Sequence, residues 1–79
     1  MRLDKYLKNS RLIKRRTIAK EACDNGRIEI NGSVAKAGTP VKVGDILSIR
    51  LGSKTTRVKI IQILDHVTKN DAENMYEYL

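Results

Sequence analysis

Residues 2–20, RLDKYLKNSRLIKRRTIAK, combine regularly spaced leucines and isoleucines with eight Lys or Arg residues and a single acid, Asp4. The whole chain of 79 residues holds 16 basic and 9 acidic residues. Subtracting the first twenty leaves eight of each sign in residues 21–79, so the entire net charge of +7 lies in the first quarter of the chain. Like charges this close repel one another, which indicates a polyanionic partner: nucleic acid, an anionic membrane or an acidic protein.

The apolar positions within this block predict two short helices. Leu3 and Leu7 lie four residues apart with Tyr6 beside them, which predicts a helix over residues 2–9 with one apolar edge. Further on, a second helix is predicted over residues 16–25, because apolar residues recur at helical spacing before Gly26, a residue type that commonly follows a helix end. Those apolar residues are Ile18, Ala19, Ala22 and Cys23.

Strand patterns follow the helices. Residues 28–30 alternate apolar and polar side chains, Asn31-Gly32 is typical of a type I′ hairpin turn, and residues 33–35 return on the far side. Two more strands are expected over residues 46–51 and 56–64, the second with a bulge or two-sided burial near Ile61.

The C-terminal residues carry a helical pattern. Residues 70–73, NDAE, match a capping box, and apolar residues recur after it at i, i+3, i+4 and i+7. We therefore expect a short terminal helix, which would present Ala72, Met75, Tyr76 and Leu79 on one face.

Length and composition restrict the class of protein. Seventy-nine residues suffice for one domain with a modest core, which must be aliphatic because Phe and Trp are absent. Cys23 is the only cysteine, so neither an internal disulfide nor a structural zinc site is expected, and a reducing cytoplasm fits best. No apolar run is long enough for a membrane span or a signal peptide.

The run Lys14-Arg15-Arg16 stands where the second predicted helix begins. Cations there oppose the helix dipole, and Arg15 cannot cap the free amides, so the arrangement is unfavourable in the free protein but favourable around a bound phosphate. One alternative is that Thr17 caps the helix and the basic run is only solvated. Similarly, Asp4 has two interpretations. It forms a salt bridge with Lys8 or a nearby arginine, or it acts in binding, either by aligning an arginine for a phosphate or base contact or by accepting from an exocyclic amine of a base.

With three tyrosines as the only aromatic residues, stacking on unpaired bases can contribute little, so the basic face favours folded RNA. Four motifs then resemble the S4 RNA-binding domain family over residues 1–51, with a weaker likeness through residue 64: RLDKYL, SRLIKRR, GRIEING and VKVGDILSI. The resemblance implies an α+β, S4 (alpha-L) RNA-binding fold, in which two short N-terminal helices pack on a small, mostly antiparallel sheet. We expect residues 1–64 to form this domain and residues 65–79 a C-terminal extension with the short helix.

The matching positions imply central RNA contacts at Arg2, Asp4 and Arg16, surrounded by Lys5, Lys8, Arg11, Lys14, Arg15 and Lys20. Within the family, the chain is similar to stand-alone S4 proteins of bacterial ribosome-associated quality control. This likeness implies a monomer that binds obstructed large ribosomal subunits holding peptidyl-tRNA, contacts large-subunit rRNA and tRNA, and supports alanine tailing by RqcH. The alternatives are an S4 protein that recycles separated large subunits after heat shock and a generic module for structured RNA.

Other function classes lack support in the sequence. One His, one Cys and scattered acids form no catalytic signature, and we expect Cys23 to be a core residue and His66 a surface residue. No cofactor or metal is expected. A membrane-surface role would need a broader apolar face on the first helix, whereas a protein-docking role for Met75, Tyr76 and Leu79 stays open.

Overall fold

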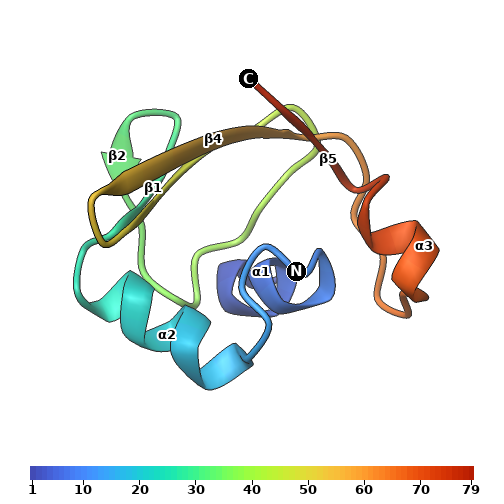
Figure 1. Cartoon of the computed structure of the whole chain (residues 1–79), viewed down its shortest axis with the longest axis horizontal. Helices are drawn as coiled ribbons and strands as arrows, with labels where there is room; N and C mark the ends of the chain where they lie inside the picture. Colours follow the sequence, from blue (N-terminus) through green and yellow to red (C-terminus); the bar gives the residue numbers. More distant parts are fainter.

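Two short helices lie against one face of an antiparallel sheet in the computed structural model, which describes all 79 residues (Figure 1). The elements in chain order are α1 (Leu3–Asn9), α2 (Arg16–Asp24), β1 (Ile28–Ile30), β2 (Ser33–Val34), β3 (Ile46–Leu51), β4 (Lys54–Ile60), α3 (Lys69–Ala72) and β5 (Tyr76–Tyr78). The expected α+β architecture of two N-terminal helices on an antiparallel sheet is confirmed. Its longest helix has nine residues, and none of the helices has the length and apolar character needed to cross a bilayer.

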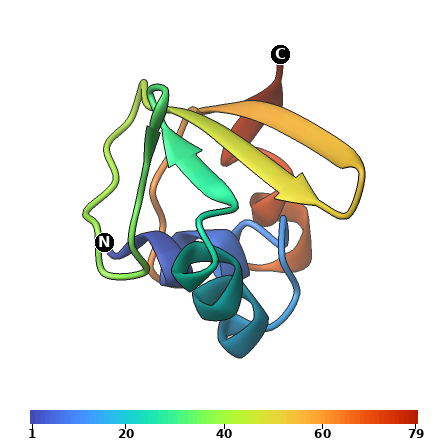
Figure 2. The ribbon, with the colours of Figure 1, turned by 90° about the vertical axis from the view of Figure 1, so that its left-hand side faces the viewer.

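The sheet has the strand order β2-β1-β3-β4-β5, and all neighbouring strands are antiparallel. Both α1 and α2 lie on the same side of the sheet (Figure 2). Burial alternates along β3 and β4, so the face toward the helices is apolar and the other face is exposed. The buried face carries Ile28, Leu47, Ile49, Val58 and Ile60.

The core extends from this face to the helices. Leu3, Tyr6 and Leu7 of α1 are fully buried, as expected from their spacing. In α2 the residues Ala19, Ala22 and Cys23 are buried, which confirms the core position of Cys23. Ile18 differs from the expectation, since it is 45% exposed.

The hairpin between β1 and β2 has the predicted turn. Asn31 and Gly32 have φ values of 51° and 87°, the two positive angles that a type I′ turn requires. The Asn31 side chain also fixes the turn to the start of β3, because its Nδ2 donates to Asp45 Oδ1 at 3.1 Å and its Oδ1 accepts from the Ile46 amide at 2.9 Å. Local turn chemistry and a long-range contact therefore agree at this position.

The predicted short helix near the C-terminus forms, but it covers only residues 69–72 and does not continue to Leu79. Residues 69–72 form the single helical turn α3, and residues 76–78 form strand β5, which pairs with β4 in the register Val58↔Tyr78, Lys59↔Glu77 and Ile60↔Tyr76. The sequence YEY fits a strand as well as a helix, and a short isolated helix is costly to nucleate. Residues 76–78 form a strand because their backbone groups pair with those of β4, which would otherwise be unpaired at the edge of the sheet.

Two element boundaries also differ from the sequence prediction. The capping box lies two residues earlier, with Thr68 as the N-cap and Asp71 as the third helical residue, because the Thr68 hydroxyl and Asp71 carboxylate each accept from the other's backbone amide. Strand β4 covers residues 54–60 instead of 56–64. Regular pairing ends at Ile60.

A bulge follows β4 near Ile61, as expected. The amides of Ile61 and Gln62 both donate to the carbonyl oxygen of Met75, at 2.8 and 3.1 Å, so that two residues lie opposite one. The hydroxyl of Tyr6 donates to the same carbonyl at 2.8 Å. Met75 and Tyr6 are fully buried, and burial raises the pKa of Tyr6. This carbonyl therefore joins α1 to the C-terminal strand.

Tyr6→Phe removes one of the three hydrogen bonds at the Met75 carbonyl and leaves the packing nearly unchanged. Because two amides still donate to that oxygen, we expect a loss of about 1 kcal/mol in the free energy of unfolding. Thermal unfolding should show a midpoint lowered by about 4–8 °C. As a matched control, Tyr78→Phe removes an exposed hydroxyl whose contact is a 3.4 Å hydrogen bond with the Tyr76 hydroxyl, and it should leave the midpoint nearly unchanged. Equal midpoints for the two variants would contradict the role given to this bond.

Candidate nucleic-acid interface

The N-terminal end of α1 is closed by the rest of the chain. The amide of Leu3 donates to the Thr39 carbonyl at 2.8 Å, and the amide of Asp4 donates to the Ala37 carbonyl at 3.1 Å. The Lys5 amide donates to the carboxylate of Asp4 at 2.8 Å. Because these amides have partners within the protein, the first helix offers none of them to an anion.

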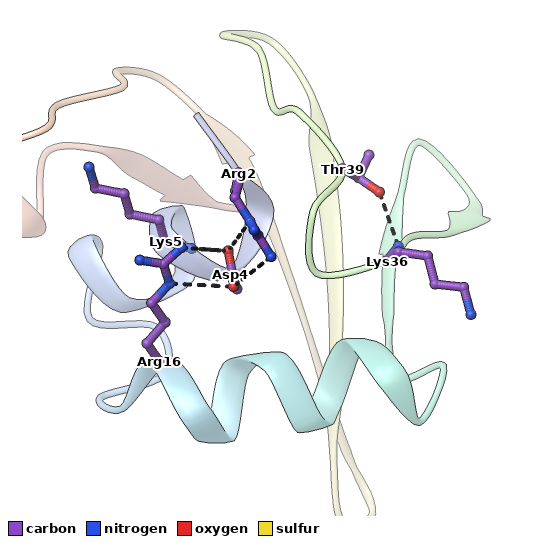
Figure 3. A network of polar contacts seen from close by, with 6 residues as sticks. All are labelled: Arg2, Asp4, Lys5, Arg16, Lys36 and Thr39. Atoms are coloured by element: carbon purple, nitrogen blue, oxygen red, sulfur yellow. Dashed lines mark hydrogen bonds and ion pairs between the residues drawn. The ribbon is translucent and has the colours of Figure 1, made fainter.

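Asp4 itself is buried, with only 4% of its side chain exposed, and it lies between two arginines (Figure 3). Arg2 Nε lies 3.2 Å from Asp4 Oδ1, and Arg16 Nε lies 3.4 Å from Asp4 Oδ2. A second nitrogen of each guanidinium also donates to the carboxylate, at 3.4 Å for Arg2 and 3.5 Å for Arg16. The expected salt bridge with a nearby arginine is confirmed, whereas the alternative pair with Lys8 does not form. Asp4 instead holds both arginines together.

The two guanidinium groups remain accessible despite these bonds. The side chains of Arg2 and Arg16 are 55% and 49% exposed. Together with one carboxylate they leave a net charge of +1, on planar groups whose remaining N–H donors point away from Asp4 and match the oxygens of a phosphate. The carboxylate therefore fixes the guanidinium positions without neutralising both.

Opposing effects set the ionisation of Asp4. Burial by itself favours the neutral acid, but the hydrogen bonds from Arg16 and the Lys5 amide, with the charges of Arg16 and Arg2, hold the pKa of Asp4 below its usual value. The group is thus a carboxylate at neutral pH.

The second helix begins without a cap. Arg15 is the N-cap residue with no side-chain hydrogen bond to the helix, and the first turn contains no acid. The alternative in which Thr17 caps the helix is therefore wrong. Since Arg16 is the first residue of α2, the arginines meet at a helix end that has free amides and the positive end of the dipole.

The remaining predicted site residues divide into three sets. Lys5 Nζ lies 3.3 Å from Asp65 Oδ1 on the segment after β4. Lys8, Arg11 and Lys14 line a groove at the C-terminal end of α1. Arg15 and Lys20 are exposed and form no salt bridge.

Sequence reasoning missed Gly38, which lies against the Arg2 guanidinium. A Cβ at this position would lie 3.8 Å from Arg2 Cζ, in van der Waals contact. The sequence marks Gly38 only as part of a turn, and the contact exists because residues 37–41 run beside the start of α1, where the Val41 amide donates to the Met1 carbonyl. Nothing in the local sequence indicates that approach.

The side chains that could support catalysis are Cys23 and His66. Burial raises the pKa of Cys23 to about 11, with smaller effects from the charges of Asp4 and Asp24, so its thiol is protonated at neutral pH. His66 is exposed, as expected. No group of three or more His, Cys, Asp or Glu side chains is arranged to hold a metal ion.

Comparison with known proteins identifies the family. The S4 domain model matches residues 1–47. A relative from Halalkalibacterium halodurans named RQC P-site tRNA stabilizing factor is 60% identical over 77 residues, with 98% of this chain and 88% of the relative covered. One of the same name from Bacillus subtilis is 56% identical over 79 residues, with 100% and 92% covered. The chain belongs to the S4 domain family.

A solved structure extends the likeness of this S4 domain to three dimensions. The trimeric structure of heat shock protein 15 from Vibrio cholerae superimposes with a TM-score of 0.92 at 29% identity. The alignment covers 100% of this chain and 81% of that one. The residues after 47, which the S4 model does not match, are thus included in a shared arrangement.

Asp4→Asn removes the charge that holds Arg2 and Arg16 and keeps the shape of the side chain. We expect the free energy of unfolding at pH 7 to fall by about 1–2 kcal/mol, because the ion pairs of the Asp4 carboxylate with Arg2 and Arg16 are lost. The loss is no larger because the exposed guanidinium groups regain water. The pKa of Asp4 is lowered in the folded state, so its contribution is complete above the unfolded value of about 3.9 and is lost as pH falls through the folded value.

Denaturant unfolding of the wild type and Asp4→Asn at pH 7 and at pH 3 measures this effect, and the difference between them should shrink at the lower pH. Asp24→Asn, which changes an exposed carboxylate without a salt bridge, serves as the control and should differ little at either pH. A difference for Asp4→Asn that is equal at both pH values would contradict the ionic role.

Proposed function

We propose that this chain is a non-enzymatic RNA-binding protein that associates with large ribosomal subunits in bacterial ribosome-associated quality control. Membership of the S4 domain family supports RNA binding. The relatives named RQC P-site tRNA stabilizing factor, which match over nearly the whole chain, support the quality-control role and binding to tRNA.

The observation that carries the proposal is the pair of half-exposed arginines held by Asp4 at the start of α2. Guanidinium groups bind phosphate oxygens through two parallel N–H donors, and a helix N-terminus adds free amides and a favourable dipole. Because Asp4 fixes Arg2 and Arg16 before any ligand arrives, less side-chain freedom is lost on binding. The site is thus suited to the backbone of folded RNA.

In its finer form, the proposal concerns obstructed large subunits that still hold peptidyl-tRNA. The protein contacts large-subunit rRNA and the tRNA, and it supports the addition of C-terminal alanine tails by RqcH. It acts as a cytoplasmic, ribosome-associated monomer. Residues 1–64 form the RNA-binding S4 unit, and residues 65–79 are an extension whose strand β5 completes the sheet.

A second candidate function is the binding of separated large subunits for recycling after heat shock. The close superposition on heat shock protein 15 from Vibrio cholerae favours it. The two functions differ in the state of the subunit that is bound, so binding to empty subunits and to subunits that hold peptidyl-tRNA separates them.

Arg16→Ala is expected to weaken binding to large ribosomal subunits by roughly 10- to 100-fold, because it removes a positioned guanidinium and leaves Arg2 as the one arginine paired with Asp4. Co-sedimentation with purified subunits measures the affinity. Lys42→Ala removes the same charge from an exposed position outside the basic block and should bind like the wild type. Equal losses for the two variants would overturn the proposed interface.

Occupied and empty subunits are expected to bind differently. We expect tighter association with subunits that hold peptidyl-tRNA than with empty ones, because tRNA adds phosphate contacts. Association should be tighter still when RqcH is present. The measurement is co-sedimentation of the wild type with each preparation, with Arg16→Ala as the control for non-specific binding. Preference for empty subunits, unchanged by RqcH, would favour the heat-shock function.

A further inference from the structure

The outer edge of β5 has no neighbouring strand. β5 lies at one end of the strand order and pairs on its inner side with β4 (Figure 1). On that side the Leu79 amide donates to the Arg57 carbonyl at 3.0 Å. Because hydrogen bonding alternates along an antiparallel pair, the N–H and C=O groups of Tyr76 and Tyr78 point away from β4. These four backbone groups have no partner in the protein, and such an edge can pair with another chain.

The side chains at this edge include exposed apolar surface. Tyr78 is 68% exposed and Leu79 is 62% exposed. The Tyr78 ring packs edge-on against Tyr76, with the ring centroids 5.3 Å apart, and Tyr76 in turn packs against the core. Met75 is fully buried. The protein-docking role that the sequence leaves open for this segment therefore concerns the two tyrosines and Leu79, and not Met75.

The C-terminal part of the chain differs in charge from the rest. Residues 61–79 contain four acidic residues and one basic residue, which gives a net charge of −3 where the first twenty residues carry +7. Asp65 forms an ion pair and Asp71 caps α3. Glu73 and Glu77 are exposed and form no salt bridge. Two acids of this segment are therefore free to attract a cation.

Both free acids lie at β5. Glu77 is the middle residue of the strand and stands opposite Lys59, so a cation in a further strand would lie on its other side. Glu73 lies near Tyr76: burial raises the pKa of Tyr76 to about 12, with smaller effects from Tyr78 and from the charge of Glu73. The edge thus favours a basic segment and disfavours the phosphates of RNA.

A second copy of this chain does not complement the edge. The antiparallel two-fold pairing that uses all four free backbone groups joins Tyr76 of one copy to Tyr78 of the other. This pairing places Glu77 directly opposite Glu77 of the second copy, and like charges in a cross-strand pair are destabilising. A lysine or arginine at that place would reverse the effect. Charge complementarity therefore favours a basic strand from another protein.

We propose that the outer edge of β5 binds an extended, basic segment of a partner protein, which joins the five-stranded sheet as an additional antiparallel strand. A lysine or arginine of the segment lies opposite Glu77 on the exposed face. The residues on either side of it bond to the backbones of Tyr76 and Tyr78 and place apolar side chains beside the two rings. The recognised pattern is apolar, basic, apolar. The inference goes beyond the proposed RNA-binding function and uses a different surface.

Titration of the whole protein with the capped peptide Thr-Val-Lys-Val-Thr, followed by amide NMR, tests the proposal. We expect a Kd on the order of 0.1–1 mM, because a few hydrogen bonds and one exposed ion pair contribute little each. The amides of Tyr76 and Tyr78 should shift most. Their hydrogen exchange should slow by roughly 10-fold at ten times the Kd, because exchange requires the free edge. Absence of these effects would overturn the proposal.

Two altered peptides separate the contributions of charge and backbone. Replacing the lysine by glutamate places like charges opposite each other at Glu77 and should weaken binding by roughly 3- to 10-fold. N-methylation of both valines removes the donors to the carbonyls of Tyr76 and Tyr78 and should abolish binding at this edge. Equal affinities for the three peptides would overturn the proposal, because they would reflect non-specific contact.

A change of charge in the protein tests the position of the lysine. Glu77→Gln should weaken binding of the lysine peptide by roughly 2- to 5-fold and should not weaken binding of the glutamate peptide. Glu21→Gln removes the same charge from an exposed residue of α2 without a salt bridge and should bind like the wild type. Equal losses for the two variants would contradict the pairing with Glu77.

Tyr78→Pro tests the backbone contact from the side of the protein. The amide that it removes makes no bond to β4, so the unfolding midpoint should fall by no more than about 4–8 °C, whereas peptide binding should be lost. Tyr78→Ala lacks the ring but keeps the amide, and it should retain part of the affinity. Full peptide binding by a folded Tyr78→Pro would overturn the proposal. If this variant does not fold, the N-methylated peptide gives the same test on the wild type.

An RNA hairpin and the protein itself are the competing occupants. The hairpin should leave the amides of Tyr76 and Tyr78 unshifted, and Arg16→Ala should bind the peptide like the wild type, so failure of RNA binding and failure of the edge are separate results. Shifts of the two tyrosine amides by RNA would assign the edge to nucleic acid. Shifts that grow with protein concentration would assign it to a second copy, and either result overturns the proposal.

Discussion

The ion pairs of Asp4 determine how the two helices present their charge. The carboxylate is buried and accepts from Arg2, which precedes α1, and from Arg16, which begins α2. It also accepts from the Lys5 amide, within a helix start whose preceding amides bind the loop over residues 37–39. A buried charge is costly unless its hydrogen bonds are satisfied, so the correct packing of α1, α2 and that loop is required for the carboxylate to be stable.

The arrangement of the basic residues in the free protein has a cost in stability. One cluster shares a carboxylate and keeps two guanidinium groups half-exposed, whereas the other, at Lys8, Arg11 and Lys14, has no acid paired with it. An uncapped start of α2 and the left-handed backbone conformation of Arg11 add to this cost. Binding sites commonly retain such unfavourable features, because a polyanion that contacts them lowers the energy of the complex and not that of the free protein.

Local patterns predicted most of the fold. The spacing of Leu3, Tyr6 and Leu7 and the Asn31-Gly32 turn act between near neighbours, so the first helix and the hairpin could be derived from the residues alone. The continuation of the terminal helix to Leu79 was predicted wrongly, because the residues around Tyr76 fit a strand as well as a helix and the choice depended on the open edge of β4. For the same reason, the site could be predicted as a set of basic residues but not as two clusters with different partners.

The sequence by itself determined the net charge and its concentration in the first twenty residues. It also determined the spacing of apolar residues that gives helices first and strands after them. These properties depend only on composition and short-range spacing. Tertiary structure alone decided that Asp4 joins Arg2 to Arg16 instead of pairing with Lys8, and that Asp65 pairs with Lys5 across the chain. Ion pairs form between the groups that packing brings within reach, and those groups here are up to 60 residues apart. Which cations have an acidic partner and which have none therefore follows from the folded contacts.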